Sequence, residues 1–284
     1  MDDNHKHIMS IQRISTLILI FFGSSVLLAP SAQAATFRTN VSQSKDPQAD
    51  IWLQSITQKD KQGKDQTFSN FSFVTRVNIL QNDKHTTLNT GAASTDRGDK
   101  ASEPKGLKVA ENPDAEGIAA YLGNNNLNNI IDTEDQGAFK MNLWFDTTIS
   151  QDSSGLDNLF FWERGMNSDL DIQAIGENGN LLGNILKLTR KVDQQDAGYK
   201  IDTTEIGGAQ NVGSWGVSLK QLGLNDEQAI KGIKGIQVSA KTTYNGPDFK
   251  VIARSVPEPS TTAALAVVAM SALKVLNKKR LAKV

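Results

Sequence analysis

The sequence predicts an all-β protein: an antiparallel β-sandwich body between an N-terminal signal helix and a C-terminal transmembrane helix. Short segments with alternating apolar and polar residues recur through residues 35–255, and such alternation is typical of strands that bury one face. Segments rich in Gly and Asn separate them, as turns do. Many short strands at such spacing favour a sandwich or a barrel. Both chain ends carry an apolar run beside basic residues.

Composition excludes several classes of function. The chain has 284 residues and a formal net charge of -1. The two ends carry more basic than acidic residues, so the middle of the chain is acidic. Nucleic-acid binding requires clustered Lys and Arg, so we expect no nucleic-acid partner. The absence of cysteine excludes disulfides, thiolate catalysis and Cys-ligated zinc.

Histidine is equally scarce. The three histidines are His5, His7 and His85, and the first two precede the expected start of the mature chain. No site with several histidine ligands can therefore form in the exported body. A Ser-His-Asp triad would have to use His85, which lies in a polar stretch and is interpreted as a solvated loop residue.

The N-terminus has the pattern of a secretory signal peptide, which we place at residues 1–34. Arg13 precedes an uncharged apolar run, and Ala32 and Ala34 form an A-x-A cleavage motif. Signal peptidase would cut between Ala34 and Ala35. The acidic residues after Met1 are unusual in such a segment, so both Met1 and Met9 remain candidate starts. An uncleaved membrane anchor is the alternative.

The exported domain is placed at 35–255, and its clearest strand is the segment 71–79. Phe71, Phe73, Thr75, Val77 and Ile79 alternate with polar residues there and are expected to share one face. The segment 139–145 alternates in the same way, and further short strands follow it. The polar region at about 81–114 is interpreted as a long loop or insertion. A short helix is expected at 224–234 with Asn225 as its N-cap.

The C-terminus combines three features in a fixed order. Val256, Pro257, Glu258 and Pro259 come first, an apolar stretch at 260–276 follows, and Lys278, Lys279 and Arg280 come next, before a tail end at 281–284. Seventeen residues are near the lower limit for crossing about 30 Å of hydrocarbon. The basic cluster should stay in the cytoplasm. The two prolines keep the motif extended, as a segment read by a processing enzyme would be.

This order resembles the PEP-CTERM sorting signal of exosortase-dependent surface proteins, here spanning 256–280. The resemblance implies export across the inner membrane, transient membrane insertion, recognition by an exosortase, cleavage near the motif, and delivery to the cell surface or extracellular matrix. Lys274 interrupts the apolar stretch, and four residues follow Arg280, which are departures from the pattern. A plain single-span anchor is the alternative.

The second half of the body has a further resemblance. The stretches "DNLFFWERGMNSDLDIQAIGENGNLLG" and "GSWGVSLKQLGL", followed by "IKGIQVSA" and "NGPDFKVIAR", are similar in order to the galactose-binding-like jelly roll. The similarity covers about 125–254. It implies a jelly-roll-like sandwich and carries over no ligand site.

A structural calcium ion is the only cofactor considered, because Asp and Asn oxygens are the hard ligands that calcium prefers. The candidate ligands are Asn125, Asp132, Asp135 and Asp248. No EF-hand spacing occurs, and an Asn-rich solvated loop is the alternative.

Two alternative functions, glycan hydrolysis and sugar binding, would use other residues. Asp157, Glu163, Asp169 and Asp171 could supply a pair of acids for glycan hydrolysis, although solvated charges on a strand explain them equally well. The tryptophans could form a sugar-stacking platform, although core packing is expected for three of them: Trp144, Trp162 and Trp215.

The prediction is therefore a non-enzymatic, exosortase-processed surface or matrix protein. Its expected partners are signal peptidase, exosortase, the membrane and extracellular polysaccharide. A surface-anchored carbohydrate-binding module and a glycan hydrolase are the alternatives.

Overall fold

The computed structural model describes residues 37–42, 46–86, 91–192 and 194–256. The signal segment 1–34 lies outside the described residues, and so does the C-terminal tail from Pro257 onward, including the expected helix at 260–276. Within the described residues, no helix combines the length and apolar character that a membrane crossing requires.

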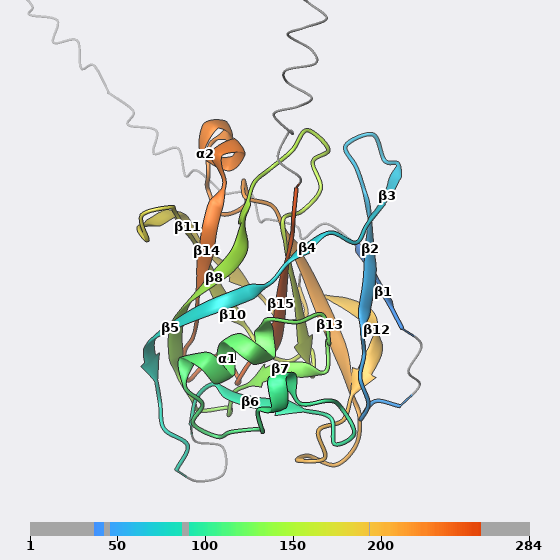
Figure 1. Ribbon diagram of the computed structural model, residues 1–284, viewed down its shortest axis with the longest axis vertical. Coiled ribbons are helices and arrows are strands. Elements are labelled where there is room, and N and C mark those ends of the chain that lie inside the picture. The colour runs from blue at the N-terminus through green and yellow to red at the C-terminus, as the bar shows by residue number, and fades with distance from the viewer. Residues whose placement is uncertain (1–36, 43–45, 87–90, 193, 257–284) are drawn as a thin grey trace, which may run out of the picture. The chain divides into compact units, whose positions relative to one another are not determined.

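The described residues form an all-β structure with three antiparallel sheets (Figure 1). A three-stranded sheet contains, in spatial order, β1 (Phe37–Val41), β2 (Leu53–Lys59) and β3 (Asp65–Phe68). A five-stranded sheet contains β11 (Leu181–Leu188), β10 (Leu170–Ile175), β14 (Ile233–Ala240), β8 (Phe139–Ile149) and β5 (Val74–Asn82). All pairings are antiparallel, as the sequence predicts.

The central sheet has seven strands. Its spatial order is β12 (Gln195–Ile201), β13 (Gln210–Val217), β9 (Leu159–Arg164), β15 (Asp248–Arg254), β7 (Asn129–Asp132) and β6 (Ser94–Arg97), and the two-residue β4 (Phe71–Ser72) also pairs with β15.

The central sheet is covered on both faces, and β9 shows this most clearly. Leu159 and Phe161 belong to the core shared with the five-stranded sheet. Phe160 and Trp162 belong to a second core shared with the three-stranded sheet. Alternate residues of a strand point to opposite faces, so a strand buried on both sides reads as the continuous apolar run "LFFW". The body is therefore a sandwich with a third, smaller layer.

The segment 71–79 is not one strand. Phe71 and Ser72 form β4 on the central sheet, and the chain passes at Phe73 to the five-stranded sheet, where β5 begins at Val74. A register shift between Val74 and Arg76 then alters the alternation. Val74 and Val77 are consequently buried, whereas Thr75 is exposed. The expectation that Phe71, Phe73, Thr75, Val77 and Ile79 share one face was wrong because the segment changes sheets and contains a bulge.

Two helices and one 3-10 turn complete the fold of the described residues. The helix α2 (Asp226–Lys231) begins after Asn225, whose side chain accepts from the Gln228 backbone in a capping box, which confirms the expected N-cap. The helix α1 (Ala115–Leu122) was not expected from the sequence and packs near β5. The polar segment 81–114 contains the end of β5, the strand β6 and the turn η1 (Pro104–Gly106).

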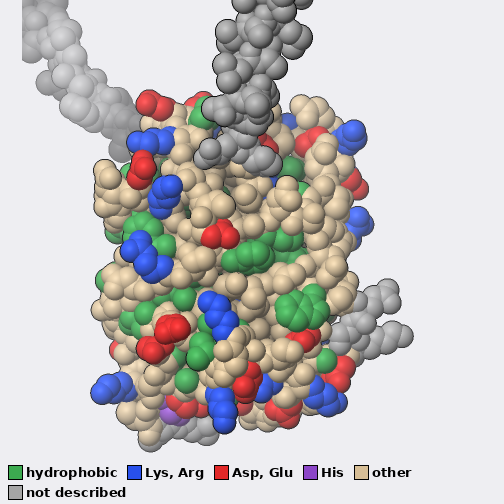
Figure 2. All heavy atoms as spheres, in the orientation of Figure 1, with side chains coloured by type: hydrophobic (Ala, Val, Ile, Leu, Met, Phe, Trp, Pro, Cys, Tyr) green, Lys and Arg blue, Asp and Glu red, His purple; other side chains and the backbone are tan. Residues whose placement is uncertain are grey.

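Charged side chains of both signs are interspersed over the face drawn in Figure 2. This distribution gives that face no extended basic field of the kind that attracts nucleic acid.

Candidate functional site: carboxylates around Arg164

The most concentrated group of titratable side chains lies where strand ends of the central sheet meet one loop. Asp96 is on β6, Asp132 ends the neighbouring β7, and Glu205 comes from the loop between β12 and β13. Arg164 ends β9 and is paired in register with Asp248 at the start of β15. Segments far apart in the chain therefore place four carboxylates around one guanidinium.

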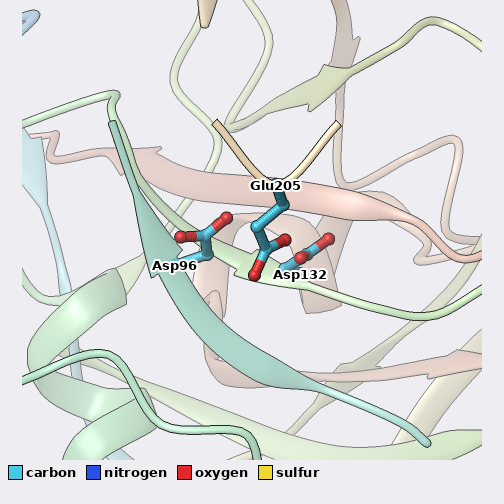
Figure 3. A group of neighbouring side chains, drawn as sticks. All are labelled: Asp96, Asp132 and Glu205. Carbon is cyan, nitrogen blue, oxygen red and sulfur yellow. The ribbon is translucent and has the colours of Figure 1, made fainter. Parts of the chain in front are cut away.

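The carboxylates of Asp96, Asp132 and Glu205 converge on one another (Figure 3). One oxygen from each lies within 4.8 Å of the others. The Arg164 Nη2 atom lies 3.3 Å from Asp132 Oδ1 and 3.0 Å from Asp248 Oδ2. Arg164 also donates to the Thr203 hydroxyl, in the same loop that carries Glu205.

Burial makes this accumulation of charge costly. Asp96, Asp132, Asp248 and Arg164 are each less than one tenth exposed, whereas Glu205 is exposed. Burial, together with repulsion from Asp132, raises the pKa of Asp96 to about 7. Burial and repulsion from Asp96 and Asp132 raise the pKa of Glu205 to about 8. The site therefore favours protons or another positive charge between its carboxylates.

Beside the cluster, two buried oxygen atoms have no hydrogen-bond partner among the described residues. They are Asp96 Oδ2 and Thr133 Oγ1, on residues that are 6% and 4% exposed. The Thr133 backbone N–H donates to Asp248 Oδ1 at 3.1 Å, so the backbone at this position is satisfied and the hydroxyl is not. Buried polar atoms normally find a partner; these two leave unused acceptor capacity beside the cluster.

The cluster opens to a surface hollow of about 630 Å³. Its lining includes Asp132, Thr133, Glu205 and Asp248, so a solute that enters the hollow comes close to these side chains. All the donor atoms in the group of three carboxylates are oxygens, which suits hard cations such as Ca²⁺ or Mg²⁺.

The structure brings together only part of the calcium set expected from the sequence. Asp132 and Asp248 meet at Arg164, and Asp135 lines the same hollow. Asn125 lies elsewhere, with its side-chain amide donating to the Leu53 carbonyl at 3.1 Å. Its amide therefore supports the edge of β2.

The four candidate catalytic acids have separate partners. Asp157 accepts from Gln58 at 2.6 Å, and Glu163 accepts from Gln194 at 2.8 Å. Asp169 pairs with Lys187 at 2.7 Å, and Asp171 accepts from the Tyr244 hydroxyl at 2.8 Å. Asp157 and Glu163 are six residues apart along nearly extended chain, which corresponds to about 20 Å, too far to flank one glycosidic bond.

The tryptophans fall into two groups. Trp162 and Trp215 are buried in the two cores, as expected. Trp144 is partly buried, with the Arg76 guanidinium 4.3 Å from its ring centroid, and Trp52 is 36% exposed.

His85 lies at the rim of the hollow. Its Nδ1 is 3.5 Å from a Glu111 carboxylate oxygen and 3.8 Å from one of Glu134. His85 is therefore less solvated than the sequence indicated, because long-range folding places two acidic residues beside it.

The structure does not describe most residues of the two terminal signals. The cleavage residues Ala32, Ala34 and Ala35, the motif residues Pro257, Glu258 and Pro259, and the basic residues Lys278, Lys279 and Arg280 lie outside the described residues. Val256 is the last described residue, two positions after the end of β15.

Comparison with known proteins gives no match: no family model, no curated protein and no solved structure is significantly similar to this chain.

Proposed function

We propose that this chain is a non-enzymatic, exported protein that an exosortase processes at its C-terminus and delivers to the cell surface or extracellular matrix. The proposal rests on the paired terminal signals in the sequence: a signal peptide at 1–34 and the ordered motif, apolar stretch and basic cluster at 256–280. Signal peptidase and the exosortase are then the partners of the chain, and the membrane is a transient one.

The strongest support for the proposal is that the motif follows closely after the last described strand. The last described strand, β15, ends at Arg254, and the Ser255 backbone donates to the Asn70 carbonyl at 3.0 Å. The next residue begins the Val256–Pro259 motif. Cutting at or after the motif would therefore leave every described strand and every described core residue in place, as a sorting signal requires.

Intact mass and C-terminal peptide mapping of protein recovered from the cell surface test the proposal. We expect a chain that begins near Ala35 and stops near Val256–Pro259. A variant with Pro257→Ala, Glu258→Ala and Pro259→Ala should keep its tail and stay in the membrane fraction. Ser260→Ala, one residue beyond the motif, is the matched control and should be processed normally. Surface protein that still carries residues 278–280 would overturn the proposal.

Carbohydrate binding is the second candidate, and the outer face of the five-stranded sheet favours it. Across four neighbouring strands the register aligns the amides of Asn78, Asn142, Gln237 and Gln173. Gln237 donates to Asn142 Oδ1 at 3.0 Å. The pair of Arg76 and Trp144 lies two residues further along β5 and β8, on the same face as the amides. Amide rows beside an aromatic ring offer donors, acceptors and an apolar surface to a sugar chain.

Gel electrophoresis in the presence of soluble extracellular polysaccharide tests this second function. Retardation that Trp144→Ala abolishes would support it. Trp52→Ala is the matched control, because Trp52 is 36% exposed and lies next to β2, away from the amide row. Equal retardation of both variants, or none for the parent chain, would exclude the face as the binding surface.

A further inference from the structure

The charge balance of the Arg164 cluster is incomplete. Four carboxylates meet there, from Asp96, Asp132, Asp248 and Glu205, and among the described residues Arg164 is the only basic side chain ion-paired to any of them. Arg164 contacts Asp132 and Asp248 and leaves the Asp96 and Glu205 carboxylates without a paired cation. An excess of buried negative charge is unfavourable unless a cation or protons offset it.

The geometry of the uncompensated side fits one ion. Oxygens that bind a common Ca²⁺ lie about 2.3–2.6 Å from it, so opposite ligands can be up to about 5 Å apart. Oxygens of Asp96, Asp132 and Glu205 all lie within 4.8 Å of one another. The three side chains point into the same space (Figure 3), and an ion placed there needs no large rearrangement of the backbone.

One atom outside the three carboxylates also indicates a missing partner. The buried Thr133 hydroxyl has no hydrogen-bond partner, and the residue lines the same hollow as Asp132 and Glu205. Asp96 Oδ2 is likewise buried and has no hydrogen-bond partner among the described residues. A cation would satisfy the carboxylate oxygen directly, and a water in its coordination shell could donate to the hydroxyl.

We propose that Asp96, Asp132 and Glu205 bind one divalent cation of the calcium type, with water completing its coordination. Calcium is favoured over zinc because the three ligands are carboxylates and none is histidine or cysteine. It is favoured over magnesium because one ligand comes from a loop, and calcium tolerates irregular, flexible geometry better. Of the four calcium ligands expected from the sequence, only Asp132 belongs to this site; Asp96 and Glu205 are the other two ligands proposed.

Binding would fix the loop between β12 and β13. Hydrogen bonds already hold the start of this loop: the Asp202 backbone donates to the Pro47 carbonyl at 3.0 Å, and Arg164 donates to the Thr203 hydroxyl. The part after Glu205 is more open, because a Cβ added at Gly207 or Gly208 would meet nothing within 4 Å. A cation held by Glu205 would join this loop to the β6–β7 edge. We therefore expect the ion to stabilise the body and to protect this loop from proteolysis.

Calorimetric titration of the purified full-length, metal-free chain with CaCl₂ tests the proposal, together with thermal unfolding in calcium and in chelator. We expect one bound ion, a rise of the unfolding temperature in calcium, and slower cleavage at residues 202–209. Glu205→Gln should weaken calcium binding at least tenfold, because it removes one charged ligand. The variant should still fold, because Glu205 is exposed on a loop.

Asp96→Asn separates ligation from a structural role. It should raise the unfolding temperature in chelator, since it removes a buried charge, and should abolish the further rise in calcium. Glu227→Gln, at an exposed carboxylate on α2, is the matched control and should behave like the parent chain. MgCl₂ and ZnCl₂ titrations should give weaker binding than CaCl₂.

Three results would overturn the proposal: no calcium heat and no thermal shift at 10 mM, binding that Glu205→Gln leaves unchanged, or a calcium-dependent thermal rise in Asp96→Asn equal to that of the parent chain. None of them bears on the sorting proposal, because these measurements do not depend on export or on C-terminal cleavage.

Discussion

Arg254 and Asp152 form a two-point ion pair: Nη1 lies 2.7 Å from Oδ2, and Nη2 lies 3.2 Å from Oδ1. Arg254 is the last residue of β15, and its Nε also donates to the Asp157 carbonyl at 3.0 Å. One side chain thus fastens the end of the final strand to the segment that leads into β9. Planar, two-point pairing of this kind is the strongest form of the Arg–carboxylate interaction.

Arg254→Ala should therefore destabilise the body by about 3 kcal/mol, since it removes a mostly buried guanidinium and leaves the Asp157 carbonyl without this donor. Urea unfolding measures the loss. Lys59→Ala is the control, because its ion pair with Asp65 at 2.8 Å is exposed and should change stability by less than about 1 kcal/mol. Equal effects of the two variants would contradict this account of the β15 end.

Asp157 should make stability fall as pH rises. Burial raises its pKa to about 7, against the lowering influence of the Gln58 hydrogen bond. The folded chain therefore binds more protons than the unfolded chain between about pH 4 and pH 7, and the stability present at low pH is lost as pH rises through 7. The full loss amounts to at most about 4 kcal/mol.

Asp157→Asn should remove that part of the pH dependence, because its amide oxygen can still accept from Gln58. Urea unfolding at pH 5 and pH 8 checks this: the difference between the two pH values should be smaller in the variant than in the parent chain. Glu116→Gln, at an α1 carboxylate outside the cores, is the control. Parallel behaviour of parent and Asp157→Asn would show that Asp157 is not protonated in the fold.

Lys250 is a fully buried lysine on β15, and its removal should stabilise the protein. Its ammonium group donates to the Tyr121 carbonyl and to Asn124 Oδ1, and no carboxylate is paired with it among the described residues. Burial holds the pKa of Lys250 well below its usual value. Both acceptors keep other donors: the Asn124 amide reaches the Tyr121 carbonyl at 3.4 Å, and the Asn126 backbone reaches Asn124 Oδ1 at 2.9 Å.

Lys250→Met should consequently raise the free energy of unfolding by about 2 kcal/mol near neutral pH. The parent chain should gain stability with rising pH between the lowered pKa and about 10.4, because only the unfolded chain keeps the proton there, and the variant should lose this rise. Lys140→Met, on the exposed face of β8, is the control. A destabilised Lys250→Met would mean that the hydrogen bonds outweigh the cost of burying the amine.

The sequence predicts the parts of this fold that depend on local pattern. The alternation of Phe139, Met141, Leu143 and Phe145 matches the buried face of β8, and the capping chemistry of Asn225 marks the start of α2. Alternation failed at Phe73, because a change of sheet leaves no local signal. The sequence does not predict the third layer for a similar reason. This layer packs on the central sheet through contacts such as those of Phe37 with Phe160 and Trp162, which lie more than 120 positions away.

The candidate site was harder to predict than the fold. Asp96 lies in a polar stretch that reads as loop, and Glu205 lies in a Gly-rich turn, so neither has a motif around it. Of the acids around Arg164, the sequence predicts only Asp132 and Asp248 as calcium ligands, the first in an Asn- and Asp-rich stretch and the second near the end of the domain. The sheet order that brings β6, β7, β9 and β15 together is a long-range property. Arg164 at the end of an apolar run was the one available signal, since an arginine beside a buried strand requires acidic partners.

The third layer gives the last prediction. Phe37, the first described residue, packs edge-on against Phe160 and Trp162, with ring centroids 4.9 and 5.9 Å apart, and the Trp162 indole donates to the Thr39 hydroxyl at 2.9 Å. Phe37→Ala should destabilise the body by about 3 kcal/mol, since it leaves a cavity over β9, and should alter the fluorescence that Trp162 contributes. Arg38→Ala, at the exposed neighbouring position, should change neither property. Since Phe37 lies two residues after the expected cleavage site at Ala34–Ala35, a large effect would also mean that processing further into the chain removes a strand that the core needs.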